Sequence, residues 1–275
     1  MNKRGGKYDY VAIGSSRADN IIDPNLINQN ASLSGINIAN SGSAFLENYL
    51  TLLEFLDKNQ TQSVLLCADI FGVINPSRAY GNRPFHEYFF ISYLDNDTIC
   101  HEVSNQVSWF KMKMWKIMPL TGYMEYNNIY TLDKLMTGKF DNNKFDNNKG
   151  FDAPPEKSKT VFNVKNGYSY YGIDSASVSY LNKIIALCNK RKTKLILYSP
   201  PIYFSAYKKM LGADKGFKLI NSIAEKHNIT YLNFANSYLS LDSNLFNDNN
   251  HLNFSGSQLF SSIIGDSLKS KLIQQ

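Results

Sequence analysis

Short apolar runs, separated by turn-forming residues, recur along the chain and predict the strands of a buried sheet. The runs are rich in β-branched and aromatic residues and show no polar alternation, which is typical of strands covered on both faces. The runs predicted as strands are residues 8–13, 36–39, 63–68, 194–198 and 230–233.

Between these runs lie segments in which apolar residues recur at helical spacing. In residues 44–56, for example, Phe45, Tyr49, Leu52 and Leu56 fall on one face of a helix. Parallel neighbouring strands need crossover connections, and these are usually helical. The alternation therefore predicts an α/β fold with three layers, in which helices cover both faces of a parallel sheet. The predicted helices are residues 44–56, 175–190, 206–210, 215–226 and 255–272.

The periodicity is lost over residues 72–171, where aromatic, Asn and Lys residues mix without a steady repeat. We interpret this stretch as a long irregular insertion in a single domain that spans residues 1–275. A Lys-Phe-Asp-Asn-Asn unit is repeated over residues 139–148, and we expect a flexible loop or lid tip there. Trp109 and Trp115 are interleaved with lysines, which fits either the cover of the insertion's own core or a surface that binds sugars or nucleic acid.

Composition is that of a globular protein and excludes several other classes. The chain has 275 residues, of which 43% are hydrophobic and 19% charged, with 16 Gly and 8 Pro, so collagen-like and coiled-coil chains are excluded. No apolar run approaches the ~18 residues of a membrane-spanning helix. The net charge is +6, but the lysines are scattered and do not by themselves indicate an anionic partner. Cys67, Cys100 and Cys188 lack zinc-binding spacing and lie in or near apolar runs, which predicts buried free thiols.

The first predicted strand ends abruptly at Gly14-Ser15-Ser16-Arg17. A glycine there permits a sharp turn, and a serine after it can expose its hydroxyl beside the N–H groups of the next helix. Such a serine suits nucleophilic attack on an ester carbonyl, although it equally suits the role of a helix cap. Gly14 stands alone in this turn, so neither of the glycine-rich loops that bind nucleotide phosphates is present.

A second polar cluster, Asp248 to His251, lies between the last predicted strand and the last predicted helix. A serine becomes a good nucleophile when a base accepts its proton, and an imidazole is a suitable base when a carboxylate holds its tautomer and orientation. Asp248 and His251 can supply both groups. The alternative interpretation is a plain turn with a solvated or hydrogen-bonded histidine.

Taken together, the Gly-Ser-Ser after the first strand and the Asp-x-x-His before the last helix resemble the SGNH (GDSL-like) hydrolase superfamily. The resemblance covers most of the chain outside the insertion and implies a flavodoxin-like α/β/α fold. It implies that Ser16 is the nucleophile and that His251 and Asp248 complete a Ser-His-Asp catalytic triad. Asn40-Ser41-Gly42 resembles the second block of the family, in which the N–H groups of the glycine and the nucleophile, here Gly42 and Ser16, form the oxyanion hole.

The third block departs from the family's pattern. The family has Gly-x-Asn, whose Asn side chain completes the oxyanion hole, but this chain has Cys67-Ala68-Asp69. An ionised Asp69 would repel an oxyanion, so we expect it to be protonated, turned away, or hydrogen-bonded to Arg17 or another base. Arg17 is a candidate either for binding an anionic substrate group or for pairing with a structural carboxylate. Asn40 is a further candidate for contact with substrate or for support of the site.

The finer details look most like a branch of the superfamily associated with cell-envelope polysaccharides. They are the Gly-Ser-Ser-Arg start, the variant third block, the Tyr-Ser-Pro-Pro of residues 198–201 and the Asp-x-x-His-Leu-Asn ending. Members of this branch resemble the alginate acetylation proteins and the teichoic acid D-alanylation protein. The resemblance implies a serine esterase or an O-acyltransferase such as an acetyltransferase, which acts through an acyl-enzyme on acylated, O-acetylated carbohydrate of an envelope or secreted polysaccharide.

Two other functions stay open. One is a catalytically silent domain that binds glycan or a partner in polysaccharide assembly, and the other is a lipase or phospholipase with an apolar lid, which the polar repeat does not resemble. The resemblance implies no cofactor, no metal and no nucleic-acid partner. Membrane contact is expected only through an anchor upstream of the first strand, which would place the protein in the cell envelope, and otherwise we expect a cytoplasmic protein.

Overall fold

The computed structural model describes residues 5–73, 86–126, 147–156, 172–210 and 212–272, and most of the repeat at residues 139–148 lies outside them. The chain forms two compact units. The first, here the sheet unit, is made of Met1–Arg83 and Asn143–Gln275, and the second, here the helical unit, is Pro84–Asn142. Each unit is described by itself below.

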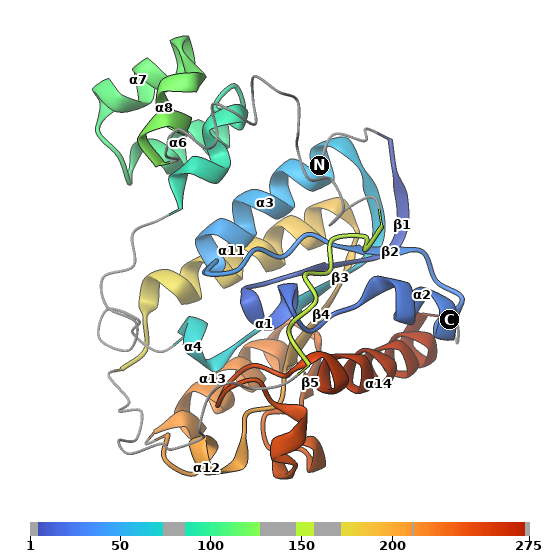
Figure 1. Cartoon of the computed structure of the whole chain (residues 1–275). Helices are drawn as coiled ribbons and strands as arrows, with labels where there is room; N and C mark the ends of the chain where they lie inside the picture. Colours follow the sequence, from blue (N-terminus) through green and yellow to red (C-terminus); the bar gives the residue numbers. More distant parts are fainter. Residues whose placement is uncertain (1–4, 74–85, 127–146, 157–171, 211, 273–275) are drawn as a thin grey trace. The chain divides into compact units, whose positions relative to one another are not determined.

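Five parallel strands form the centre of the sheet unit (Figure 1). They lie in the order β2-β1-β3-β4-β5. This arrangement confirms the predicted α/β fold with a parallel sheet. The second strand is shorter than expected, because the side chain of Asn37 accepts the N–H of Ala39 and the chain leaves the sheet there. The strands are β1 (Lys7–Ile13), β2 (Gly35–Asn37), β3 (Gln60–Cys67), β4 (Lys194–Ser199) and β5 (Thr230–Asn233).

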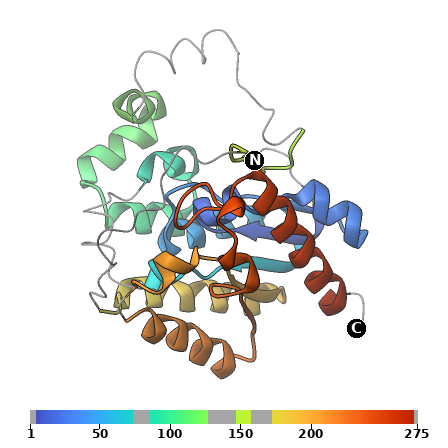
Figure 2. The same ribbon diagram turned by 60° about the horizontal axis from the view of Figure 1, so that its bottom comes forward.

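Helices cover both faces of this sheet, as Figure 2 shows. Helices α3 (Phe45–Lys58), α11 (Ser175–Arg191) and α13 (Ala213–Lys226) pack on one face. Helices α2 (Pro24–Ala31) and α14 (Phe254–Leu272) pack on the other, together with the short α1. The expected three layers are therefore present. The short helices of this unit are α1 (Ser16–Asp19), α4 (Ile70–Val73), α12 (Phe204–Tyr207), η2 (Tyr238–Leu241) and η3 (Ser243–Leu245).

The strands are apolar on both sides because each side packs under a helical layer. Successive side chains of a strand point to opposite faces. In β3, Val64 and Leu66 join the core beneath α3 and α11, while Leu65 and Cys67 join the core beneath α2 and α14. All four are buried, which explains the continuous apolar run in the sequence.

Two helices of the sheet unit differ from the sequence prediction. The helix expected at residues 206–210 is α12 at Phe204–Tyr207, where Tyr203 precedes the first turn. Helix α2 was not predicted, because its Asn and Gln residues hide the apolar face. Its start carries a recognisable signal, since Asp23 accepts the N–H of Asn25 and Pro24 occupies the first turn.

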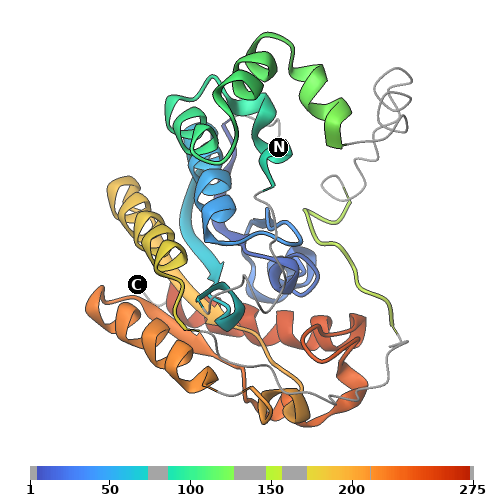
Figure 3. The ribbon, with the colours of Figure 1, turned by 90° about the vertical axis from the view of Figure 1, so that its left-hand side faces the viewer.

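The insertion is not irregular throughout, which corrects the expectation for residues 72–171. The helical unit contains a 3₁₀ helix, η1 (Glu87–Tyr93), and helices α6 (Asp97–Ser104), α7 (Trp109–Ile117) and α8 (Pro119–Tyr126), drawn in green tones in Figure 3. These elements are 7 to 9 residues long, too short for a steady period to emerge in the sequence. They enclose a small core of their own, made of Phe90, Ile91, Leu94, Ile99, Val103, Met112 and Trp115.

Two expectations about individual residues and spans can also be compared with the structure. Cys67 and Cys188 are buried, whereas Cys100 is only partly buried, and all three are free thiols. No helix in the described ranges combines the length and the apolar character needed to cross a membrane.

Candidate active site

The carboxyl ends of the parallel strands meet at one edge of the sheet, and the candidate residues follow these ends. The chain runs from β1 to β2 on one side and to β3 on the other, so the strand order switches at β1. Such a switch point is where ligands bind in open parallel sheets. Ser16 follows β1 and Asp69 follows β3, which places both at this point.

The turn after β1 depends on a close approach that only glycine permits. A Cβ on Gly14 would lie 2.6 Å from Cys67 Cβ and 2.8 Å from Ala18 Cβ. Ser15 is the helix cap, because its Oγ accepts the N–H of Arg17 at 3.3 Å. Ser16 is the first residue of α1, and its hydroxyl is left for a partner outside the helix.

The turn that carries Asp248 and His251 is held by buried residues on both sides. Phe246 and Leu252 are buried and pair in an antiparallel bridge. Asn253, which is 3% exposed, donates its side-chain amide to the carbonyl of Asn244 at 2.6 Å. The fixed ends of the turn present its polar residues to the edge of the sheet.

Ser16, His251 and Asp248 form one continuous chain of hydrogen bonds. The Oγ atom of Ser16 lies 2.8 Å from Nε2 of His251. On the other side of the ring, Nδ1 of His251 lies 2.9 Å from each carboxylate oxygen of Asp248. The structure therefore brings together three side chains from opposite ends of the sequence.

The environment of Asp248 favours its charged form. Burial by itself raises the pKa of this carboxyl. Three effects outweigh burial and hold the pKa below its ordinary value: the hydrogen bond from the His251 ring, the electrostatic interaction with His251, and the hydrogen bonds from the N–H groups of Asn250 and His251. An ionised Asp248 accepts the proton on Nδ1. In the neutral imidazole this arrangement leaves the lone pair of Nε2 facing the Ser16 hydroxyl, which is the tautomer a general base needs.

The loop of Gly42 is fastened beside the turn after β1. Asn40, half-buried, donates its N–H to the carbonyl of Gly14 at 3.2 Å. Asp19 of α1 accepts both the N–H and the hydroxyl of Ser41, at 3.2 and 3.0 Å. Gly42 itself has φ +86°, a left-handed conformation that favours glycine. Among the described residues, no hydrogen-bond acceptor is found for the N–H of Ser16 or of Gly42.

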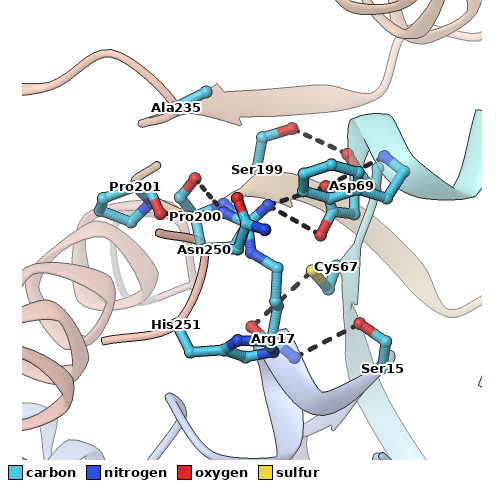
Figure 4. Close-up of polar contacts among 12 residues, drawn as sticks. Ser15, Arg17, Cys67, Asp69, Ser199, Pro200, Pro201, Ala235, Asn250 and His251 are labelled. Carbon is cyan, nitrogen blue, oxygen red and sulfur yellow. Dashed lines mark hydrogen bonds and ion pairs between the residues drawn. The ribbon is translucent and has the colours of Figure 1, made fainter. Parts of the chain in front are cut away.

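Arg17, the residue that follows Ser16, forms a buried ion pair with Asp69 (Figure 4). Nη1 of Arg17 donates to both oxygens of Asp69 at 2.9 Å. Nη2 donates to the carbonyls of Pro200 and Pro201 at 2.8 and 2.9 Å. The guanidinium also lies over the ring of Phe71, 5.5 Å from its centroid. One residue thus links the start of α1 to the ends of β3 and β4.

This arrangement accounts for a buried aspartate at the end of β3. The charge of Asp69 is matched by Arg17, and its Oδ1 also accepts the N–H of Phe71 at 3.2 Å. Arg17 is only 3% exposed, so its geometry favours the structural pairing over contact with an anionic substrate group. The nearby thiol of Cys67 is buried, and burial raises its pKa, so the thiol stays protonated.

Sequence reasoning missed several residues that hold this site. Asn37, fully buried, donates its side-chain amide to the carbonyls of Ala18 and Ile22 and so fixes the end of α1. Asp19 fastens the Gly42 loop, as described above. Asp19 lies three residues after Ser16 and could have been noticed in the sequence. The hydrogen-bond partners of Asp19 and Asn37, however, depend on the tertiary fold. The described residues contain no group of three or more His, Cys, Asp or Glu side chains suited to a metal ion.

Comparisons with known proteins add similar structures but no assigned family. No protein-family model matches the chain, and no curated protein sequence matches it. An acetyl xylan esterase is similar over 94% of this chain and 98% of its own, with 10% identity and a TM-score of 0.46. A GDSL-like lipase from Bacteroides thetaiotaomicron is similar over 96% of this chain and 89% of its own, with 10% identity and a TM-score of 0.41. The functional assignment therefore depends on the geometry of the site itself.

Proposed function

We propose that this chain is an SGNH-like serine esterase or O-acyltransferase that acts on acylated, O-acetylated carbohydrate of an envelope or secreted polysaccharide. The observation that carries the proposal is the hydrogen-bonded chain from Ser16 through His251 to Asp248, with distances of 2.8 and 2.9 Å. A serine hydroxyl, an imidazole and a carboxylate in this order are the groups of nucleophilic acyl transfer.

The proposed reaction has two steps, which use the same side chains. Ser16 Oγ forms a bond to the acyl carbon while Nε2 of His251 takes the hydroxyl proton. The sugar oxygen then leaves with that proton, and the acyl group stays on Ser16 as an ester. Water or a second sugar hydroxyl attacks this ester and gives its proton to His251, which passes the proton to the departing Ser16 oxygen. Water as acceptor makes the protein an esterase, and a sugar hydroxyl makes it a transferase.

The oxyanion of each step needs donors that are already in place. The N–H groups of Ser16 and Gly42 are the proposed donors, because neither has an acceptor among the described residues and both lie in fastened turns. Each donor of this kind is worth roughly 3 kcal/mol in the transition state. Asp69 contributes no donor, because Arg17 holds its carboxylate.

The carbohydrate substrate is the less direct part of the proposal and rests on the resemblance of the motifs. The openness of the site supports it. The side chains of His251 and Asp248 are 31% and 36% exposed, so an acyl group that projects from a large polymer can reach Ser16 at the edge of the sheet. A fully enclosed site would favour small free esters instead.

The test compares two neighbouring serines. Wild type, Ser16→Ala and Ser15→Ala are labelled with a fluorophosphonate probe and assayed with p-nitrophenyl acetate. We expect Ser16→Ala to lose labelling and to lose roughly 10⁴-fold or more in hydrolysis. Ser15→Ala, which removes only the cap, is expected to keep both. Equal rates in wild type and Ser16→Ala would remove Ser16 from the mechanism.

A second candidate is a catalytically silent domain that binds glycan or a partner protein. It is favoured by one observation, the aspartate at the position of the asparagine donor. A wild-type protein that resists the fluorophosphonate probe yet retains its fold would support it.

If the probe does react, release of acetate from an O-acetylated polysaccharide, with and without an added acceptor sugar, separates an esterase from a transferase.

A further inference from the structure

Exposed apolar side chains are concentrated in one short stretch of the helical unit. Six of the ten large hydrophobic residues that are exposed in the described chain lie between residues 109 and 120. The most exposed is Ile117 at 79%. The six, here called the α7 surface, are Trp109, Phe110, Met114, Ile117, Met118 and Leu120.

The α7 surface is not needed for the core of its own unit. Helix α7 already buries Met112 and Trp115, which lie on its inner side. A helix with one buried stripe usually carries polar residues on the opposite side. Here Phe110 and Ile117 lie there instead, Trp109 is exposed on the flank of the helix, and clustered exposed apolar residues mark a binding surface.

The positive charge of helix α7 favours an anionic partner. Helix α7 contains three lysines, Lys111, Lys113 and Lys116, and no acidic residue. Lys113 Nζ lies 4.0 Å from the ring centroid of Trp109, so the ammonium group sits directly beside the exposed apolar side chains. Long lysine side chains can lie along apolar groups and still extend their charge toward an anion.

We propose that the α7 surface binds the surface of an anionic lipid bilayer. Trp, Phe and Ile enter the boundary between headgroups and acyl chains, and the lysines meet the lipid phosphates. The contact is peripheral and independent of the chemistry at Ser16. It also differs from the earlier expectation that a membrane is reached only through an anchor before the first strand.

Other occupants fit this surface less well. A second copy would bring its own three lysines against these three, and like charges repel. Cores of protein interfaces are depleted in lysine, although aromatic residues and methionine are common there. Nucleic acid and sugars would use the tryptophan and the lysines, but they give no role to Ile117, Met118 and Leu120.

The experiment is vesicle cosedimentation of the full chain. One set of vesicles is phosphatidylcholine alone, and the other is phosphatidylcholine mixed with phosphatidylglycerol. The variants are W109S/F110S, K113A/K116A and the control Leu241→Ser, which replaces an apolar residue that is 63% exposed in the sheet unit. Light scattering of each protein alone reports self-association, and circular dichroism reports folding.

We expect binding to the mixed vesicles that weakens as salt is added. K113A/K116A should bind roughly 25-fold more weakly, because each lysine near such a surface contributes about a fivefold factor. W109S/F110S should bind roughly tenfold or more weakly because apolar area is lost. Leu241→Ser and Ser16→Ala should bind like wild type, so failure of the proposed activity leaves this result intact.

Three outcomes would overturn the proposal. One is a wild type that stays in solution with both kinds of vesicle. Another is equal binding by folded W109S/F110S and by Leu241→Ser. The third is a wild type that forms dimers which W109S/F110S abolishes, since the α7 surface would then be an interface between copies.

Discussion

Two pairs of acidic and basic side chains flank Ser16, and they differ in their exposure to solvent. In the first pair, the side chains of Arg17 and Asp69 are 3% and 9% exposed. In the second, the side chains of His251 and Asp248 are 31% and 36% exposed. The first pair includes the residue next to Ser16 in the chain and lies in the core. The second pair contacts the Ser16 hydroxyl at the edge of the sheet.

This difference separates the two tasks of the site. Arg17 is held by four hydrogen bonds and by burial, so it cannot turn toward a substrate, and its effect on Ser16 is to fix the first turn of α1. His251 lies where solvent and substrate have access, and each of its ring nitrogens has one partner, which is what proton transfer needs. We infer that Arg17 is a positioning residue and that His251 is the proposed base.

The largest expected effect comes from changing the exposed pair. Asp248→Asn keeps the shape of the side chain but removes the charge that orients His251. We expect hydrolysis of p-nitrophenyl acetate to fall about 10⁴-fold, while the melting temperature changes little, because the pair is partly solvated. Steady-state kinetics and thermal unfolding measure the two. Activity within tenfold of wild type would mean that Asp248 does not orient the base.

The buried pair should show the opposite balance between stability and catalysis. Asp69→Leu leaves the Arg17 charge buried without its carboxylate, and we expect the free energy of unfolding to fall by about 3–5 kcal/mol. R17M/D69L removes both charges and should regain part of this loss. Urea unfolding checks both variants. A double variant less stable than Asp69→Leu would contradict an account based on an unpaired charge.

The same double variant also tests the positioning role of Arg17. If Arg17 only stabilises the fold, a folded R17M/D69L protein should react with the fluorophosphonate probe as fast as wild type. If Arg17 positions Ser16, we expect slower labelling and a lower kcat, with KM nearly unchanged, since the pair is buried away from solvent. The single variant R17K, which keeps Asp69 and a positive charge at position 17, should label faster than R17M/D69L.

Much of the sheet and the exposed part of the site could be predicted from local patterns. The apolar runs of the strands are continuous because both faces of the sheet are covered. The run that forms β3 can be recognised in the sequence alone. Ser16, Asp248 and His251 could be predicted because a glycine-serine turn and an Asp-x-x-His turn are each local, and because the two together resemble the pattern of the SGNH hydrolases.

The buried part of the site could be predicted only as a set of alternatives. Pairing of Asp69 with Arg17 was one of several expectations. The orientation of Arg17 that makes this pair depends on the carbonyls of Pro200 and Pro201, which follow a strand far along the chain. The helices of the insertion were missed for a different reason. Each has about two turns, and Trp115 packs inward while Trp109, only six residues earlier, is 62% exposed.

A smaller effect is expected from the support beneath the exposed pair. Asn253→Ala removes the side-chain bonds to the carbonyl of Asn244 and to the N–H of Gly256, both buried or partly buried. We expect a loss of about 1–3 kcal/mol in the free energy of unfolding. Activity should fall as well, because the turn that carries His251 loosens. A variant that unfolds as wild type does would show that Phe246 and Leu252 are sufficient to hold the turn.

The smallest effect concerns the pH dependence of stability and sharpens the contrast between the two pairs. Because the pKa of Asp248 lies below its ordinary value in the folded protein, the folded state binds this proton less readily than the unfolded state. The interaction thus stabilises the fold above the ordinary pKa and is lost as the pH falls through the lower, folded value. Solvent screening keeps the contribution below about 1 kcal/mol. The free energies of unfolding of wild type and Asp248→Asn, measured in urea, should therefore differ slightly at neutral pH and converge below about pH 4. A difference that persists or widens in acid would be assigned to packing rather than to charge.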